Sequence, residues 1–203
     1  MQNPTNGSTT SLGIFYPSRL PYSRVEWAYL AGLFDGEGCV GIKQAFRTHS
    51  FNKVTGRHNA LAVHHVRLLI SNTYMPMLCW VRNTFGGAVS ISNKNRARNG
   101  WQASCMWLSV KRSHMLYILD GMLPYLQYKD REAILTVQLI NHLESHVGRP
   151  CHPLPDDVIL ERVNLVESIR DIPGRRQTNR SKIPDWCKQM IVNHDWAIDE
   201  GAT

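Results

Sequence analysis

The sequence predicts an α+β protein built around one four-stranded antiparallel sheet, with helices on one face and a polar, basic face opposite. Two pairs of segments alternate apolar with polar residues, which indicates strands at 39–47, 60–71, 88–93 and 101–110. Apolar residues at helical spacing flank and separate these pairs, which predicts helices near 28–36, 74–85, 112–122 and 130–145. At 203 residues the chain can bury a full core as one domain.

Composition divides the chain into three parts. Residues 1–23 contain no acid and no signal-peptide core, so we expect a flexible N-terminal arm. Residues 24–148 are expected to form the domain, and residues 149–203 a helical and basic C-terminal extension with a helix near 156–171. No apolar run reaches the roughly 20 residues that would cross a membrane, so no membrane partner is expected.

The chain is basic, since Lys and Arg number 23 against 16 for Asp and Glu, which gives a net charge of +7. Such a balance points to a polyanionic partner, most often a nucleic acid. The five cysteines are odd in number and contain no Cys-x-x-Cys pair, which argues for reduced thiols and against a zinc site. We therefore expect a reducing compartment, either an organelle (chloroplast or mitochondrion) or the cytoplasm of a bacterium or phage host.

The first predicted helix carries a face of small residues. Because they recur at i, i+3, i+4, i+7 and i+8, five residues share this side: Ala28, Ala31, Gly32, Asp35 and Gly36. Two interior glycines cost about 1 kcal/mol each relative to alanine, a penalty that close helix approach can offset. Since the pattern occurs once per chain, we predict a homodimer with this face at a two-fold interface.

Glu37 follows the small-residue face, where the last carbonyls of a helix carry partial negative charge. A carboxylate beside such carbonyls predicts a cation site formed by Glu37 and the backbone at Gly36, and its hard oxygens favour Mg²⁺, with Mn²⁺ as a substitute. Asp35 is expected to cap or pack at the helix end. The alternative is an ordinary helix stop with a solvated acid.

The run from Leu30 to Gly38, LAGLFDGEG, closely resembles the signature of the LAGLIDADG homing endonucleases. It differs at Phe34, Gly36 and Glu37, where the signature has isoleucine, alanine and aspartate. The predicted order of elements over 24–145 is also similar to the family's αββαββα half-unit. The resemblance implies an intron-encoded, single-motif enzyme that makes a Mg²⁺-dependent double-strand cut, with short 3′ overhangs, in a long pseudo-palindromic DNA site.

The resemblance also implies two further catalytic residues. The segment 123–133 is similar to the one that precedes the family's late helix, and Lys129 occupies the place of its catalytic lysine. Asn72 matches a polar residue at a strand end that orders water near the metal. The family's basic residue a few positions later has no counterpart in 74–77, and Arg82 is the nearest substitute.

Double-stranded DNA is the expected partner of the polar sheet face and of the basic hairpin tips, 47–58 and 93–100. Arg and Lys can read guanine and Gln can read adenine in the major groove, while basic tips contact phosphates. The predicted contacts are Lys43, Arg47, His65, Arg67, Ser90, Ser92, Lys94, Arg96, Arg98 and Gln102. The alternative is that these residues form solvated strand faces, as in most antiparallel sheets.

Two other functions remain open from the sequence. The chain could be an intron maturase that binds its own intron RNA, or a DNA-binding protein of the same fold that does not cleave. It could also be a metalloenzyme without a nucleic-acid substrate, for which only the carboxylate argues. The presence of Glu37 favours the endonuclease, because degenerate members of the family usually lose this acid.

Overall fold

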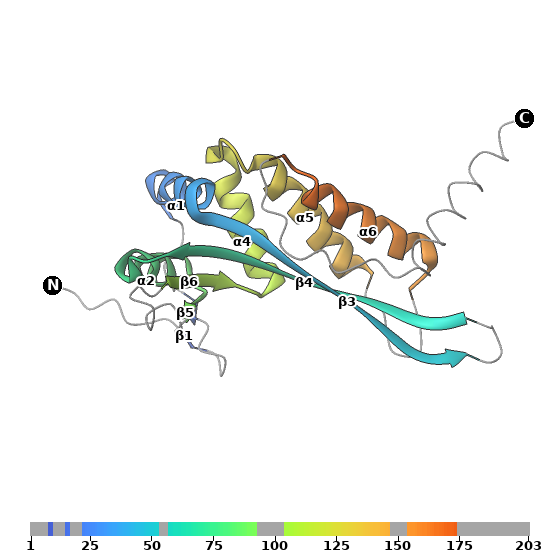
Figure 1. Cartoon of the computed structure of the whole chain (residues 1–203). Helices are drawn as coiled ribbons and strands as arrows, with labels where there is room; N and C mark the ends of the chain where they lie inside the picture. The colour runs from blue at the N-terminus through green and yellow to red at the C-terminus, as the bar shows by residue number, and fades with distance from the viewer. Residues whose placement is uncertain are drawn as a thin grey trace, which may run out of the picture. The chain divides into compact units, whose positions relative to one another are not determined.

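The computed structural model describes residues 8–9, 15–16, 22–52, 57–92, 104–146 and 154–173 (Figure 1). For residues 44–52 and 57–63 it describes the backbone alone. The elements in chain order are β1 (Ser8–Thr9), β2 (Phe15–Tyr16), α1 (Arg24–Glu37), β3 (Gly38–Asn52), β4 (Arg57–Asn72), α2 (Met75–Phe85), β5 (Ala88–Ser92), β6 (Ser104–Ser109), α4 (Arg112–Met122), the 3₁₀ turn η1 (Leu123–Tyr125), α5 (Asp130–Ser145) and α6 (Asp156–Arg170).

The main sheet has four strands in the order β3-β4-β6-β5, so the α+β prediction is confirmed. Strand β6 pairs antiparallel with both neighbours, and Trp107 lies opposite Ile70 of β4 and Val89 of β5. The chain forms two compact units, one from residues 1–41 and 66–137 and the other from 42–65 and 138–203. Strands β3 and β4 and helix α5 each run from one unit into the other.

The core of the first unit is centred on Trp107, which is fully buried. Its indole Nε1 donates to the carbonyl of Gly86 at 2.7 Å, so its polar atom is satisfied as burial requires. Helix α1 contributes Leu30 and Phe34 to this core, four residues apart on one face. Gly87 has a φ of +90°, and a Cβ there would lie 2.6 Å from Trp107 Nε1, so only glycine fits.

Buried polar contacts join α2, β6 and α4. His114 Nε2 lies 2.6 Å from the carbonyl of Phe85, and its Nδ1 lies 2.7 Å from Ser109 Oγ. Because a carbonyl can only accept, Nε2 carries the proton and Nδ1 accepts from the Ser109 hydroxyl. Burial lowers the pKa of His114, so the ring is held in its neutral form.

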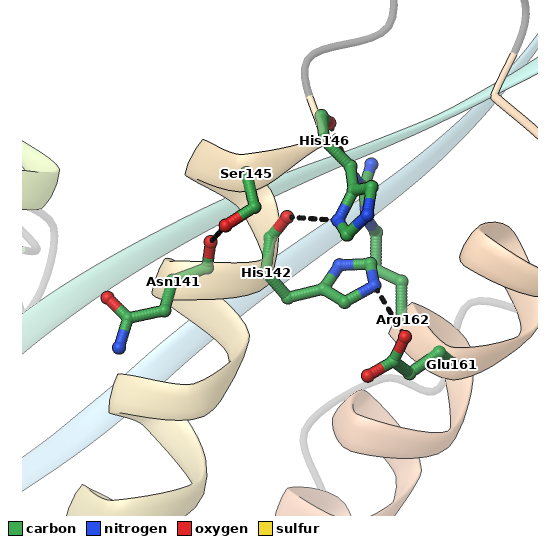
Figure 2. Close-up of polar contacts among 6 residues, drawn as sticks. All are labelled: Asn141, His142, Ser145, His146, Glu161 and Arg162. Atoms are coloured by element: carbon green, nitrogen blue, oxygen red, sulfur yellow. Dashed lines mark hydrogen bonds and ion pairs between the residues drawn. The ribbon is translucent and has the colours of Figure 1, made fainter.

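In the second unit a polar cluster joins the end of α5 to α6 (Figure 2). His142 Nε2 lies 3.1 Å from the Glu161 carboxylate, and Arg162 donates to the carbonyl of His146 at 3.0 Å. The rings of His142 and His146 lie 4.6 Å apart. Burial lowers the pKa of His142, and the neighbouring Glu161 carboxylate opposes that shift.

The first hairpin is longer than its sequence pattern predicts. Strand β3 continues to Asn52 and β4 begins at Arg57, so most of the basic loop predicted at 47–58 is strand. The alternation of apolar residues fades there, but strand pairing depends on backbone hydrogen bonds and does not require it. The arm predicted over 1–23 contains the short β1–β2 pair, and Tyr22 is buried against Trp27 and Phe85.

Candidate active site at the end of helix α1

Helix α1 brings the predicted metal ligands to its C-terminal end. A capping box starts the helix, in which Ser23 Oγ accepts from the Glu26 backbone and the Glu26 carboxylate accepts from Ser23. The helix ends at Glu37, and the Gly38 N–H bonds to the carbonyl of Phe34. Gly36 and Glu37 are both exposed there. A carboxylate and helix-terminal carbonyls therefore lie together at the protein surface.

Lys129 reaches the same helix end from a segment far away in the sequence. Its Nζ donates to the carbonyls of Phe34, Asp35 and Gly38, each at 2.7 Å. An ammonium has three N–H donors, so this set uses all of them. A positive charge at the C-terminus of α1 is favourable for the helix dipole. The bound carbonyls do not include Gly36, the residue predicted to contribute to the metal site.

The carboxylate of Asp35 returns these contacts. Its Oδ2 accepts from the backbone N–H of Gln127 at 2.8 Å, and its Oδ1 accepts from Tyr128 at 3.3 Å and Lys129 at 3.0 Å. Asp35 therefore caps the N–H groups that precede α5 and is committed to its own chain. The sequence analysis anticipated a capping role but not the partner, because residues 127–129 are separated from it by most of the domain.

A buried acid, Glu132, bonds to the backbone at the start of β3, and the sequence predicted no role for it. Glu132 in the first turn of α5 is 4% exposed, and its Oε1 accepts from the Val40 N–H at 3.1 Å. Strand β3 is at the edge of the sheet, so this carboxylate serves one of its backbone donors. No sequence pattern distinguishes Glu132 from a solvated acid of an amphipathic helix.

The donor atoms at this end are of the kind that Mg²⁺ prefers. Glu37 and the backbone at Gly36 supply hard oxygens, which Mg²⁺ prefers. Among the described residues, no three His, Cys, Asp or Glu side chains gather in a way that could hold a metal. One chain thus offers a single carboxylate at an exposed position, which suits a site completed by other groups.

The small-residue face is only partly as predicted. Ala28, Gly32 and Gly36 are exposed, and a Cβ built on either glycine meets nothing within 4 Å. Ala31 is fully buried in its own chain, and Asp35 is engaged as described above, so neither belongs to the open surface. The exposed face instead includes Val25 and Tyr29, which are 77% and 49% exposed.

The exposed residues follow one line along the helix. Val25, Tyr29, Gly32 and Gly36 occupy i, i+4, i+7 and i+11, a helical spacing that joins large apolar residues to the small ones. The open face is therefore centred on the two glycines with two larger apolar residues on the N-terminal side.

The predicted DNA-binding residues fall into three groups. Lys43, His65, Arg67 and Ser90 are exposed, and Arg67 lies over Gly41 of the neighbouring strand, where a Cβ would come within 2.8 Å of its Nε. Arg47 and Ser92 lie in strands β3 and β5, without described side chains. The remaining predicted contacts lie outside the described residues: Lys94, Arg96, Arg98 and Gln102.

Asn72 ends strand β4 and is half-buried. Its Oδ1 accepts from the Tyr74 N–H at 2.8 Å, and this bond forms a turn that leads into α2. Since Gly41 of β3 lies against Arg67 and Leu69 of β4, antiparallel pairing carries Asn72 to the end of the sheet where α1 joins β3. Arg82 lies in the last turn of α2 and donates to Asn83 Oδ1.

Comparison with solved structures identifies the fold. The chain superposes on the archaeal intron-encoded homing endonuclease I-Vdi141I complexed with DNA, with a TM-score of 0.62 and 12% identity, covering 85% of this chain and 98% of that one. It is also similar to the homing endonuclease I-CvuI in complex with its target in the presence of Ca, with a TM-score of 0.60, 17% identity, and coverage of 84% and 94%. No family model and no curated protein matches the sequence.

The fold is therefore that of the LAGLIDADG homing endonucleases, as the resemblance of residues 30–38 implied. At these identities the likeness establishes the fold and leaves the chemistry to be argued from the residues. None of the described helices is long and apolar enough to span a membrane.

Proposed function

We propose that this protein is a single-motif LAGLIDADG homing endonuclease, intron-encoded, that cuts both strands of a long pseudo-palindromic DNA site as a Mg²⁺-dependent homodimer. The observation that carries the proposal is the placement of the Lys129 ammonium at the C-terminal end of α1, where Glu37 is the last residue of the helix. Lys129 Nζ bonds to Asp35 and Gly38, on either side of Glu37, although the two segments lie about 90 residues apart in the sequence.

The residues divide the work of phosphodiester hydrolysis. Mg²⁺ bound there would supply a Lewis acid that offsets phosphate charge and activates water. Glu37 and the Gly36 carbonyl are the groups of each chain that would hold it. Asn72 uses its Oδ1 within its own turn, so its amide N–H₂ is the group that orients water.

Lys129 supplies the positive charge that offsets the developing negative charge of the phosphate. In the DNA-free protein all its donors are held by carbonyls, so direct contact with a phosphate requires the exchange of at least one of them. At its present position it already contributes a positive field beside Glu37. Two copies of this arrangement, one for each strand, give a double-strand cut.

The exposed face of α1 supports the proposed dimer. Two α1 helices packed through Gly32 and Gly36 would bring two Glu37 ends together at the two-fold axis. The sheet of each chain, with Lys43, His65 and Arg67 exposed, would then read one half-site of roughly 10 bp. The described cysteines, Cys39, Cys79 and Cys105, are free thiols, which supports a reducing compartment of the organellar or bacterial kind.

Selection for cleavage from a randomised DNA library tests the proposal. The protein is incubated with the library in Mg²⁺, and the new ends are sequenced. We expect a single two-fold related consensus with short 3′ overhangs and no cutting in EDTA. Specific binding without new ends would instead favour a maturase or a DNA-binding protein. Equal cutting in EDTA would refute the metal dependence.

A further inference from the structure

We propose that Asp35 is a positioning residue of the reaction, which sets the place of Lys129 relative to Glu37. This inference rests on the proposed function. It assigns Asp35 neither to metal nor to the dimer interface, since both carboxylate oxygens accept backbone N–H groups of its own chain.

Electrostatics explains why an acid stands at this place. A carboxylate at the C-terminal end of α1 opposes the dipole of that helix, so alone it would be unfavourable. The same carboxylate lies at the N-terminal end of α5, which begins at Asp130, and there its charge is favourable. Three backbone N–H groups without helical partners converge on it, and bonds to a charged acceptor are the stronger kind.

Asp35 and Lys129 bond to each other twice, each through the other's backbone. The Asp35 carboxylate accepts from the Lys129 N–H at 3.0 Å, and Lys129 Nζ donates to the Asp35 carbonyl at 2.7 Å. A lysine side chain has four rotatable bonds and substantial rotamer entropy, so its ammonium is placed well only if both ends are held. Asp35 holds the backbone end, and the carbonyls of α1 hold the ammonium.

The two bonds between Asp35 and Lys129 lie next to the proposed metal ligands. Gly36 and Glu37 follow Asp35 in the chain, so only Gly36 separates the residue that holds Lys129 from Glu37. A misplacement of about 1 Å at such a site can cost about 100-fold in rate. Loss of the Asp35 charge should therefore reduce the cleavage rate while leaving the DNA-binding sheet and the exposed α1 face unchanged.

The test is a double-mutant cycle between Asp35→Asn and Lys129→Met, with single-turnover cleavage and DNA affinity measured separately. In the wild-type background we expect Asp35→Asn to lower the cleavage rate about 100-fold with little change in Kd. In the Lys129→Met background the same change should lower the remaining cleavage rate by less than about threefold. Asp130→Asn is the matched control, because Asp130 is an exposed acid in the first turn of α5 and directly follows Lys129 in the chain. Its rate should stay near that of the wild type.

Equal losses from Asp35→Asn in both backgrounds would overturn the inference, since Asp35 would then act without Lys129. A fall in melting temperature with an unchanged cleavage rate would also overturn it, because it would indicate a purely structural cap. If Asp35→Asn does not fold, Asp35→Glu serves, with the charge retained and the reach changed; a wild-type rate there would equally contradict a positioning role.

A second readout does not depend on activity. The ¹⁵N-labelled ammonium of Lys129, identified by its loss in Lys129→Met, should exchange its protons slowly in the DNA-free wild type and quickly in Asp35→Asn. Fast exchange in the wild type, or no change in the variant, would refute the inference. If the wild type cleaves no DNA, the proposed function fails, and this measurement still decides the role of Asp35.

Discussion

A larger side chain on the exposed face of α1 should have opposite effects on the stability of a single chain and on the association of two chains. A Cβ built on Gly32 meets nothing within 4 Å, so the chain itself has room for a larger side chain there. Alanine is about 0.5–1 kcal/mol better than glycine in a helix interior. Gly32→Ala should therefore stabilise an isolated chain and raise its Tm by roughly 1–4 °C.

Association should respond in the other direction. If two α1 helices pack through Gly32 and Gly36, a new side chain lies between backbones, and overpacking costs about 1–3 kcal/mol per site. A two-fold interface contains the residue from both chains, so the cost counts twice and reaches about 2–6 kcal/mol. Gly32→Leu should thus weaken dimerisation at least about 30-fold without unfolding the monomer.

Sedimentation velocity over a dilution series measures this, with thermal unfolding on the same samples. Asn141→Leu is the control, because Asn141 is an exposed residue of a different helix, α5, and gains the same side chain. We expect the wild type and the control to sediment as dimers and Gly32→Leu as a folded monomer. A dimer of unchanged affinity in Gly32→Leu, or a wild type that is monomeric throughout, would refute the reasoning.

Three further predictions concern DNA recognition, pH and the core. Arg67→Ala should cost about 1–3 kcal/mol on the cognate site and relax one position of each half-site, whereas Arg98→Ala should weaken all DNA alike and reduce the salt slope by about one unit; equal effects of Arg67→Ala on cognate and scrambled DNA in a salt series would exclude a base contact. Burial lowers the pKa of His114 from 6.5, so below about pH 6.5 the unfolded chain binds a proton that the folded chain does not, and the free energy of unfolding should fall as the pH drops towards the lowered pKa. Urea unfolding at pH 7.5 and 5.5 checks this, and His114→Gln should show a smaller fall; an identical fall would place the titration elsewhere. Gly87→Ala should destabilise the fold by more than about 1 kcal/mol, because its φ is +90° and the new methyl group would clash with Trp107; an unchanged melting temperature would contradict this.

The sequence predicted the helices well and the hairpin less well. Helices α4 and α5 have the bounds predicted from apolar spacing. This signal is local in the sequence, as is the proline at position 124 that follows α4. The length of β3 and β4 is not a local property of their side chains, since one strand continues as long as the other offers backbone partners. The alternation along residues 101–110 does not say which face of β6 is the core face, and the burial of Cys105 and Trp107 identifies it.

The candidate site shows the same division. Glu37 could be predicted as a candidate from its place after a small-residue helix face. The hydrogen bonds between the Asp35 carboxylate and the backbone of residues 127–129 could not, because they join parts of the chain that no sequence periodicity relates. Small residues suit a tight contact within a chain as well as one between chains, so their spacing could not show that Ala31 is buried in its own chain. Lys129 was found by resemblance alone, since a single exposed-looking lysine carries no local signal.

Glu37→Gln tests the central claim most directly, with wild type and variant compared on the selected DNA site in Mg²⁺ and in EDTA. The change removes one negative charge from the proposed metal site and leaves the basic sheet unaltered. We predict that the wild type cuts both strands in Mg²⁺ alone, and that Glu37→Gln binds the site with similar affinity but does not cut it. Retained double-strand cleavage by the variant at saturating Mg²⁺ would contradict the assignment of the active site to the end of α1.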